Sequence, residues 1–281
     1  MNSAKIIVTR PRDQLNQAIG SIQQHLIEND LDLEVLGLPL LEIVPELNQI
    51  LAKELHEALL LAEWLSFVSP NAFLVADQLL KTYQYEWPKH LKLALIGGGT
   101  EKTILDSRFQ PALIVKPSDE SQWDSEGLWL QLTKHEKAWV GKQVLVIRGD
   151  TGRDWLVNQW QSENAQVKSI SIYKRKNLDR NDPCWQNFLL MWDQLSMTQM
   201  NHKSKCLIWI MSSSQACQYL SETLIAIGLK DVILNCSVAF VTHEKIAKSA
   251  HDIGFSQVIN ILPGPENISQ PIKDWINRSA W

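Results

Sequence analysis

Short runs of consecutive apolar residues alternate with stretches of helical periodicity along most of the chain. Residues 6–8 form the first apolar run, which is typical of a strand buried on both faces of a parallel sheet. Apolar residues then recur at helical spacing over 15–26 and alternate with polar ones over 31–35, so the pattern predicts a helix and a second strand. Strands and helices that alternate in this way predict an α/β protein whose parallel sheets are flanked by helices.

The strand–helix–strand pattern occurs twice. Residues 142–176 repeat the plan of the first unit, with an apolar strand, a glycine-containing turn, a helix and a second strand. Two further pairs of stretches match each other, because 64–79 is similar to 207–224 and 91–104 is similar to 236–250. Such internal similarity indicates two copies of one α/β plan. Taken alone, it predicts tandem halves that divide at about residue 140.

The strand-to-helix turns are the candidate ligand sites of this fold. Right-handed crossovers place them at the carboxyl edge of a parallel sheet, where open α/β sheets bind ligands. Ser69 and Asn71 follow one apolar strand, and Ser212 and Ser213 follow its counterpart. Helix capping accounts for each of these side chains taken singly. Two equivalent turns favour a binding role as well, because the free N–H groups of a helix N-terminus bind anions.

The turn at 96–102, IGGGTEK, is the most glycine-rich part of the chain. It matches neither the dinucleotide fingerprint nor the P-loop, which argues against a nucleotide-dependent transferase. Consecutive glycines let a backbone approach a ligand closely. Gly98 and Thr100 are therefore candidate binding residues, although a tight turn would explain them equally well.

Basic side chains stand at matching strand ends. Arg10 follows the first strand, and Arg148 lies at the equivalent point of the repeat, with Gly149 in the turn after it. Arg153 lies in the first turn of the next predicted helix. A cation at this position is unfavourable toward the helix dipole, so Arg153 either faces an acidic ligand or is simply solvated.

Thr242 and His243 lie in another strand-end turn. His243 is the one histidine of seven at a predicted strand end, and we assign it at most a minor role in binding. The sequence has no HExxH motif and no Cys–His cluster with metal-ligand spacing, so we expect no metal site.

Composition narrows the class of protein. The 281 residues fit two domains, and 45% apolar with 21% charged residues is ordinary for a soluble globular protein. No apolar run reaches the roughly 18–20 residues of a membrane helix, and the start lacks a signal-peptide pattern, so we expect a cytoplasmic location. Four scattered cysteines suit a reducing compartment, and a net charge of −4 gives no support for nucleic-acid binding.

Tyr173 ends the stretch SISIY, in which polar and apolar residues alternate. Continued alternation puts Ile170 and Ile172 on one face of a strand and Tyr173 on the polar face, together with Arg175. The pattern leaves two interpretations open. Tyr173 is either an amphipathic side chain at the surface or a phenol placed for chemistry.

The ordered series of motifs resembles the uroporphyrinogen-III synthase family over nearly the whole chain. In order, the matching stretches are VTRP, LGLPLLEIVP, FVSPNAF, IGGGTEKTI, SEGLWLQL, VLVIRGDTGR, IYKRK, IMSSSQA and VTHEKIAKSAHDIGF. Val68, Glu101, Met211 and Ser214 depart from the residues that are common at those positions.

The resemblance implies two similar α/β domains joined by a two-stranded antiparallel linker. Residues 1–36 and 184–281 would form one discontinuous domain, and 46–172 the other. The linker strands would be 37–45 and 173–183. We follow this division rather than tandem halves, because neither segment has the glycine or serine content of a free tether.

The resemblance also implies an enzyme that cyclises hydroxymethylbilane, a linear tetrapyrrole with many carboxylates, to uroporphyrinogen III. The last pyrrole ring is inverted and water is lost, without a metal or organic cofactor, by a monomer. Tyr173 falls where the family has a conserved tyrosine and is the candidate catalytic residue. The candidate substrate-binding residues are Arg10, Ser69, Asn71, Gly98, Thr100, Arg148, Gly149, Arg153, Ser212, Ser213, Thr242 and His243. The alternative is a non-enzymatic two-domain protein that binds or senses an anionic small molecule.

Overall fold

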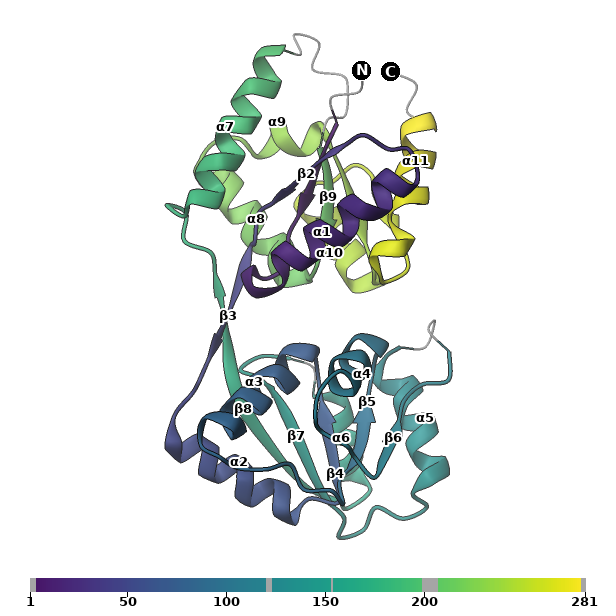
Figure 1. Ribbon diagram of the computed structural model, residues 1–281. Helices are drawn as coiled ribbons and strands as arrows, with labels where there is room; N and C mark the ends of the chain where they lie inside the picture. The colour runs from purple at the N-terminus through teal and green to yellow at the C-terminus, as the bar shows by residue number, and fades with distance from the viewer. Residues whose placement is uncertain (1–3, 120–122, 153, 199–206, 279–281) are drawn as a thin grey trace. The chain divides into compact units, whose positions relative to one another are not determined.

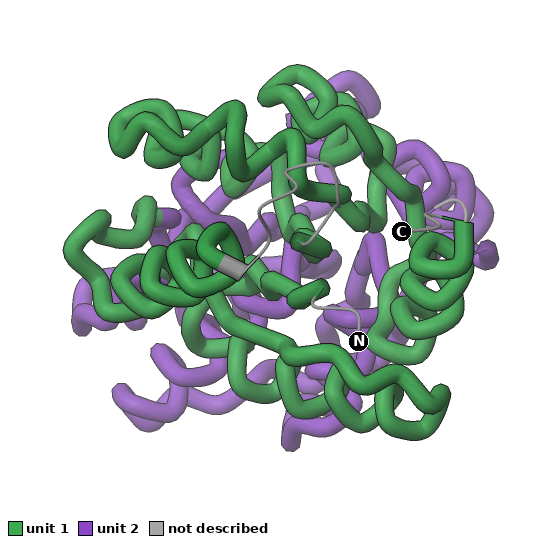
Figure 2. The backbone as a smooth tube through the Cα atoms, turned by 90° about the horizontal axis from the view of Figure 1, so that it is seen from above, with its two compact units in different colours: residues 1–42, 176–281 green, residues 43–175 purple. Residues whose placement is uncertain are grey.

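The computed structural model describes residues 4–119, 123–152, 154–198 and 207–278. The chain divides into two compact units, of which unit 1 contains residues 1–42 and 176–281 and unit 2 contains residues 43–175 (Figure 2). Both points of division lie inside 37–45 and 173–183, the two predicted linker segments.

Unit 1 is built on a five-stranded sheet in which all described strand pairs are parallel, in the order β11-β10-β9-β1-β2 (Figure 1). Its strands are β1 (Lys5–Val8), β2 (Glu34–Gly37), β9 (Leu207–Met211), β10 (Ser237–Val241) and β11 (Val258–Asn260). Its helices are α1 (Arg12–Glu28), α7 (Pro183–Thr198), α8 (Ser214–Ala226), α9 (Lys230–Asn235), α10 (Glu244–Ile253) and α11 (Ser269–Arg278), with a short 3-10 turn η2 (Pro265–Asn267).

Successive strand residues of unit 1 face two separate cores. Ile7 and Trp209 pack with α7, α8, α9 and α10 in one core. Ile6 and Ile208 pack with α1 and α11 in the other. Each central strand is therefore buried on both faces, which explains why β9 reads as the continuous apolar run LIWIM.

Unit 2 contains a six-stranded sheet in the order β3-β8-β7-β4-β5-β6. Its strands are β3 (Leu41–Pro45), β4 (Trp64–Phe67), β5 (Lys92–Leu95), β6 (Leu113–Val115), β7 (Gln143–Gly149) and β8 (Gln166–Asn177). Its helices are α2 (Gln49–Leu61), α3 (Pro70–Thr82), α4 (Gly98–Leu105), α5 (Ser125–His135) and α6 (Trp155–Ser162). The core under α2, α3 and α4 includes Phe67 and Ile147, and the core under α5 and α6 includes Trp64, Trp139 and Trp160.

The two sheets have the same plan. The order β11-β10-β9-β1-β2 of unit 1 corresponds to the order β6-β5-β4-β7-β8 of unit 2. The matched stretches of the sequence occupy equivalent strands, since β4 corresponds to β9 and β5 to β10. The predicted α/β class and internal repeat are thus confirmed, and unit 1 takes both ends of the chain rather than one half of it.

The strands β3 and β8 are neighbours in the sheet and run in opposite directions. The Glu46 N–H donates to the Ile172 carbonyl over 2.9 Å, and the Leu178 N–H donates to the Leu40 carbonyl over 3.1 Å. As the residue number increases along β3, the number of the hydrogen-bonded partner on β8 decreases, which defines an antiparallel pair. The chain passes from one unit to the other within these two strands.

Candidate active site

Tyr173 lies in the core of unit 2 and is 0% exposed, so the prediction that it lies on the polar face of its strand is wrong. The cause is a β-bulge in the pairing of β7 with β8. Arg148 is opposite Ser171, but Gly149 is opposite Tyr173, so that Ile172 is an extra residue on β8. A bulge redirects the side chains that follow it, and Tyr173 therefore joins Ile172 in the core instead of alternating with it.

Gly149 makes room for the tyrosine ring. It is buried, and a Cβ atom at this position would lie 2.5 Å from Cε2 and 2.8 Å from Cζ of Tyr173. Such distances are far below van der Waals contact, so only glycine fits beneath the ring in this packing. Gly149 is a predicted substrate-binding residue, and in the structure it lies against the phenol ring.

The Tyr173 hydroxyl has two polar partners among the described residues. Its oxygen lies 3.1 Å from Ser69 Oγ, and it accepts a hydrogen bond from Arg175 Nη2 over 3.2 Å. Ser69 is also the N-cap of α3, where its Oγ accepts a hydrogen bond from the Ala72 N–H over 3.2 Å. The cap and the tyrosine contact therefore use the same side chain, so the capping and functional interpretations of Ser69 are compatible.

Arg175 holds the phenol against the turn after β7. Its Nη1 donates to the carbonyl oxygen and to Oγ1 of Thr151, over 3.2 and 3.1 Å. Its Cζ lies 5.4 Å from the centre of the Tyr173 ring, within cation–π range. The Asp150 N–H donates to the Tyr173 carbonyl over 3.0 Å, which ties the same turn to β8.

Arg175 is not among the site residues predicted from the sequence. A signal for it was present, because residues two apart on a strand share a face and Tyr173 and Arg175 are so spaced. Residue 175 also lies in the predicted linker segment 173–183, which is a structural role and not a chemical one.

Arg148 is neutralised within unit 2. Its guanidinium forms an ion pair with Asp154, and its Nη2 lies 3.0 Å from the position that a Cβ atom on Gly152 would take. An arginine that is already paired with a carboxylate binds an acidic ligand more weakly than an unpaired one. Arg153 lies outside the described residues.

The remaining candidates of unit 2 lie in the first turns of α3 and α4. Asn71 and Thr100 are both buried. A Cβ atom on Gly98 would lie 2.8 Å from Cη2 of Trp123, so the indole ring of Trp123 covers this glycine. Gly97 is the N-cap residue of α4 and has no side chain that could accept a hydrogen bond. The first N–H groups of α4 therefore have no side-chain acceptor from the N-cap residue.

Ser212 and Ser213 have different roles at the carboxyl edge of the sheet in unit 1. Ser213 caps α8, because its Oγ accepts a hydrogen bond from the Ala216 N–H over 3.1 Å. Ser212 fixes the neighbouring strand end instead, since its Oγ donates to the Thr9 carbonyl over 3.0 Å and its N–H donates to Thr9 Oγ1 over 3.2 Å. The backbone after β1 and the backbone after β9 are thereby held together.

Arg10 follows Thr9 and is exposed. Within the described part of the chain it has no hydrogen-bond or ion-pair partner. Protein atoms around the guanidinium lower the pKa of Arg10 by desolvation, although solvent still reaches the side chain. An arginine stays protonated at neutral pH even so, which makes Arg10 a cation open to an acidic ligand.

Thr242 and His243 form the turn that follows β10. Thr242 is half-buried and His243 is exposed. His243 is the N-cap of α10, where its Nδ1 accepts a hydrogen bond from the Lys245 N–H over 3.1 Å.

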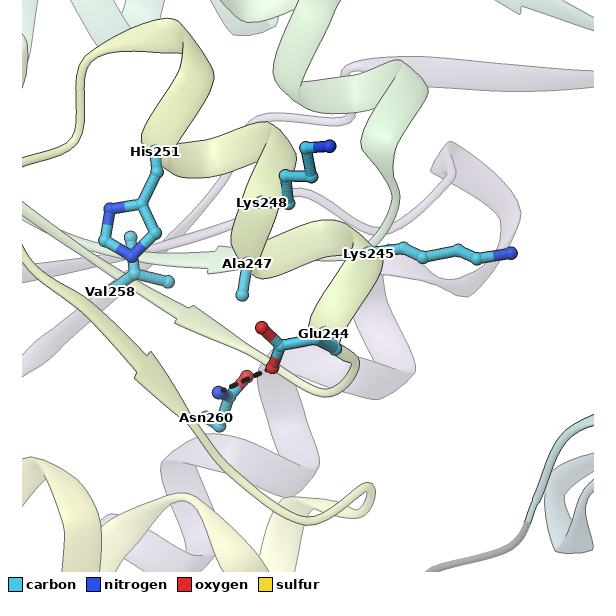
Figure 3. A pocket seen from close by; sticks show the side chains of 7 residues that line it. All are labelled: Glu244, Lys245, Ala247, Lys248, His251, Val258 and Asn260. Carbon is cyan, nitrogen blue, oxygen red and sulfur yellow. Dashed lines mark hydrogen bonds between the residues drawn. The ribbon is translucent and has the colours of Figure 1, made fainter.

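A surface groove of about 380 Å³ lies between α10 and the edge strand β11 (Figure 3). The Glu244 carboxylate faces the Asn260 amide, with 3.5 Å between Oε2 and Nδ2. The ammonium groups of Lys245 and Lys248 extend away from the groove, so it lacks the converging cations that would bind several carboxylates. None of its lining residues belongs to the predicted site.

Each unit thus presents strand-end turns and helix N-termini at the carboxyl edge of a parallel sheet, and one edge carries a hydrogen-bonded phenol. These features define a two-unit α/β protein of the class that binds its ligands at the carboxyl ends of the strands. A family model described as uroporphyrinogen-III synthase HemD matches residues 22–259, and the chain belongs to this family.

Solved structures support the fold. A mutant uroporphyrinogen III synthase from the extremely thermophilic bacterium Thermus thermophilus is 9% identical, with a TM-score of 0.57 and coverage of 98% of this chain and 99% of that chain. Uroporphyrinogen-III synthetase from Helicobacter pylori 26695 is 14% identical, with a TM-score of 0.58 and the same coverage of both chains. A search of curated proteins finds no match.

Membership of the family confirms the resemblance found in the sequence. The enzymes of this family are cofactor-independent cyclising lyases of haem biosynthesis, so the enzyme is favoured over the binding or sensor protein. Among the helices of the described residues, none combines the length and the apolar character that a membrane span requires.

Proposed function

We propose that the strand-end turns of both units bind the carboxylates of hydroxymethylbilane and that Tyr173 supplies the proton for loss of water. The observation that carries this proposal is the Tyr173 hydroxyl, held between Ser69 and Arg175 at the carboxyl edge of the unit 2 sheet. A phenol hydroxyl is both a donor and an acceptor of hydrogen bonds, and a positioned phenol can act as a general acid.

The proton is needed at the hydroxymethyl group of the substrate. When the C–O bond breaks, its electron pair leaves with the oxygen, and a proton from the enzyme converts the leaving hydroxyl to water. The pyrrole nitrogen lone pair stabilises the carbon as an azafulvene. The last ring then attacks through its substituted carbon, and the resulting spiro intermediate fragments and recloses with that ring inverted. The proton released when the pyrrole ring regains aromaticity restores the acid.

Inversion depends on the shape in which the substrate is held, because hydroxymethylbilane left alone closes without inversion. Binding energy must therefore favour one of two transition states. Free N–H groups at the N-termini of α3, α4, α8 and α10 provide donors for many carboxylates, and so does Arg10, which has no partner among the described residues. Ser69, Ser213 and His243 mark three of these helix starts as their N-caps.

Replacement of Arg10 by alanine is expected to raise the KM for hydroxymethylbilane by about tenfold, since a charge-assisted contact is worth roughly 1.5 kcal/mol. Arg148→Ala is the matched comparison, because its guanidinium already pairs with Asp154, and it should raise KM less. Steady-state kinetics of both purified variants provide the measurement. An unchanged KM in Arg10→Ala would remove this residue from the binding site.

The enzyme is tested by the isomer that it forms. The purified chain is supplied with hydroxymethylbilane, the products are oxidised to porphyrins, and the type I and type III isomers are separated. We expect the type III isomer at a yield that rises with enzyme concentration. Formation of the type I isomer alone would contradict the proposal and would favour the alternative of a binding protein.

The proposal further includes a cytoplasmic monomer that uses neither a metal nor an organic cofactor. We further propose that this monomer has two domains, one formed by 1–36 together with 184–281 and the other by 46–172. The segments 37–45 and 173–183 are the linkers between them. Sedimentation of the purified chain over a range of concentrations tests the monomer, and a second species of twice the mass would contradict it.

A further inference from the structure

The Tyr173 hydroxyl is enclosed by protein, which raises the question of how its proton reaches a substrate. Tyr173 has no exposed surface, whereas Ser69, whose Oγ lies 3.1 Å from the phenol oxygen, is partly exposed. We infer that the Ser69 hydroxyl meets the substrate and passes on the proton of Tyr173, and that Arg175 positions the phenol for this transfer. The inference rests on the proposed function, because it specifies how the proton of that reaction travels.

The relay requires one particular direction of hydrogen bonding among the three side chains. A guanidinium is a donor only, so the phenol oxygen accepts from Arg175. Ser69 Oγ accepts from the Ala72 N–H. Either hydroxyl can donate across the 3.1 Å between Ser69 Oγ and the phenol oxygen. The relay uses the arrangement in which the phenol donates to Ser69 Oγ, so that the serine keeps its own proton for a further partner. In this arrangement Arg175 donates to Tyr173, Tyr173 donates to Ser69, and Ser69 donates to the substrate.

Two protons move in a coupled transfer whose net result is that one proton passes from Tyr173 to the substrate. Ser69 gives its proton to the hydroxyl that leaves the substrate, which departs as water, and the phenol proton replaces it on Oγ. Ser69 is unchanged at the end of the transfer, and the negative charge rests on the phenol oxygen of Tyr173. The proton lost from the pyrrole ring after reclosure returns along the same path and restores the phenol.

Arg175 is built to support the charge that develops on the phenol. Two of its donor contacts go to Thr151 and one goes to the phenol oxygen, so the guanidinium is fixed before the reaction begins. A donor that is already in place stabilises developing charge without reorganisation. Lysine, as a point charge, cannot make the contacts to Thr151 and the phenol in the same fork geometry.

The test combines Arg175→Gln and Ser69→Ala with Tyr173→Phe in double-mutant cycles. Each single variant is expected to lower kcat by about tenfold or more, because a positioned acid or charge stabiliser contributes that much. In the Tyr173→Phe background, either change should lower kcat by less than about twofold, because residues that act as one unit are not additive. Ser69→Thr and Arg175→Lys should recover part of the loss, and the loss should lie in kcat rather than KM.

Control variants separate the relay from folding. Lys176→Gln removes the next cation on the chain, which is exposed, and it should leave kcat unchanged. Asn48 is the N-cap of α2, and its Oδ1 accepts a hydrogen bond from the Leu51 N–H over 2.9 Å. Asn48→Ala therefore measures how much stability and kcat change when a helix cap alone is lost. Thermal unfolding of each variant verifies that it is folded.

The outcomes distinguish the relay from the reaction it serves. Equal losses from Arg175→Gln in both backgrounds would show a structural role and overturn the positioning of the phenol. An unchanged kcat in Ser69→Ala would overturn the relay while leaving Tyr173 as a direct donor. A fully active Tyr173→Phe variant would overturn both the relay and the proposed proton source. The enzyme would still be supported if the type III isomer formed.

Discussion

Replacement of Tyr173 by phenylalanine is expected to lower kcat by about a hundredfold, the low end of the range for loss of a general acid. The ring remains, so its packing against Gly149 and the core of unit 2 is kept. Only the hydroxyl and its two hydrogen bonds are removed, and we expect a loss of stability of about 1 kcal/mol. The measurement is turnover of hydroxymethylbilane with the product isomers resolved, together with urea unfolding of the same preparation.

Tyr219→Phe is the matched control for this variant. Tyr219 is also a buried tyrosine, and its hydroxyl donates to the Leu178 carbonyl and accepts from Trp185 Nε1 over 3.1 Å in the core of unit 1. It should show a comparable loss of stability with unchanged turnover per folded molecule. Wild-type kcat in Tyr173→Phe would remove the phenol from the mechanism.

Gly149→Ala is the substitution from which we expect the largest loss of stability. The added Cβ would lie 2.5 Å from a ring carbon of the fully buried Tyr173. The ring must shift or the strand must move, and overpacking of a core costs about 1–3 kcal/mol or more. The shift also displaces the hydroxyl from Ser69 and Arg175, so kcat should fall together with the free energy of unfolding. Both are measured on the purified variant.

Gly20→Ala is the control for this change. A Cβ atom at Gly20 meets no atom within 4 Å, and the residue lies inside α1. Alanine there should stabilise the protein by about 0.5–1 kcal/mol, since glycine is unfavourable in a helix interior. A smaller cost of Gly149→Ala in a Tyr173→Leu background would identify the ring as the cause. An equal cost in both backgrounds would refute the steric explanation.

Much of the fold could be predicted from the sequence because its signals are local. The runs at β1 and β9 are apolar in succession, since a strand between two helical layers is buried on both faces. The similarity of 64–79 to 207–224 predicted equivalent places in two sheets, and β4 and β9 occupy them. Ser69 and Ser213 were interpretable as helix caps because the cap acts on a residue three positions away.

The candidate site was predictable only in part. Sequence patterns located the strand-end turns, and the resemblance to the family supplied the role of Tyr173. They did not show that Asp154 neutralises Arg148 or that Trp123 covers Gly98. Each of these contacts depends on how a loop folds back on its sheet, and no periodicity reports that path.

The sequence by itself determined that this protein is an α/β repeat whose turns gather at the carboxyl edges of its sheets. Only the tertiary structure decided where Tyr173 points. Alternation along β8 holds as long as each residue pairs with one residue of β7, and one extra residue, Ile172, ends that correspondence. Whether a strand accommodates a bulge depends on its neighbour, where Gly149 leaves the space that the tyrosine ring fills. The hydroxyl therefore meets Ser69 and Arg175 because of a pairing between two strands that neither strand encodes alone.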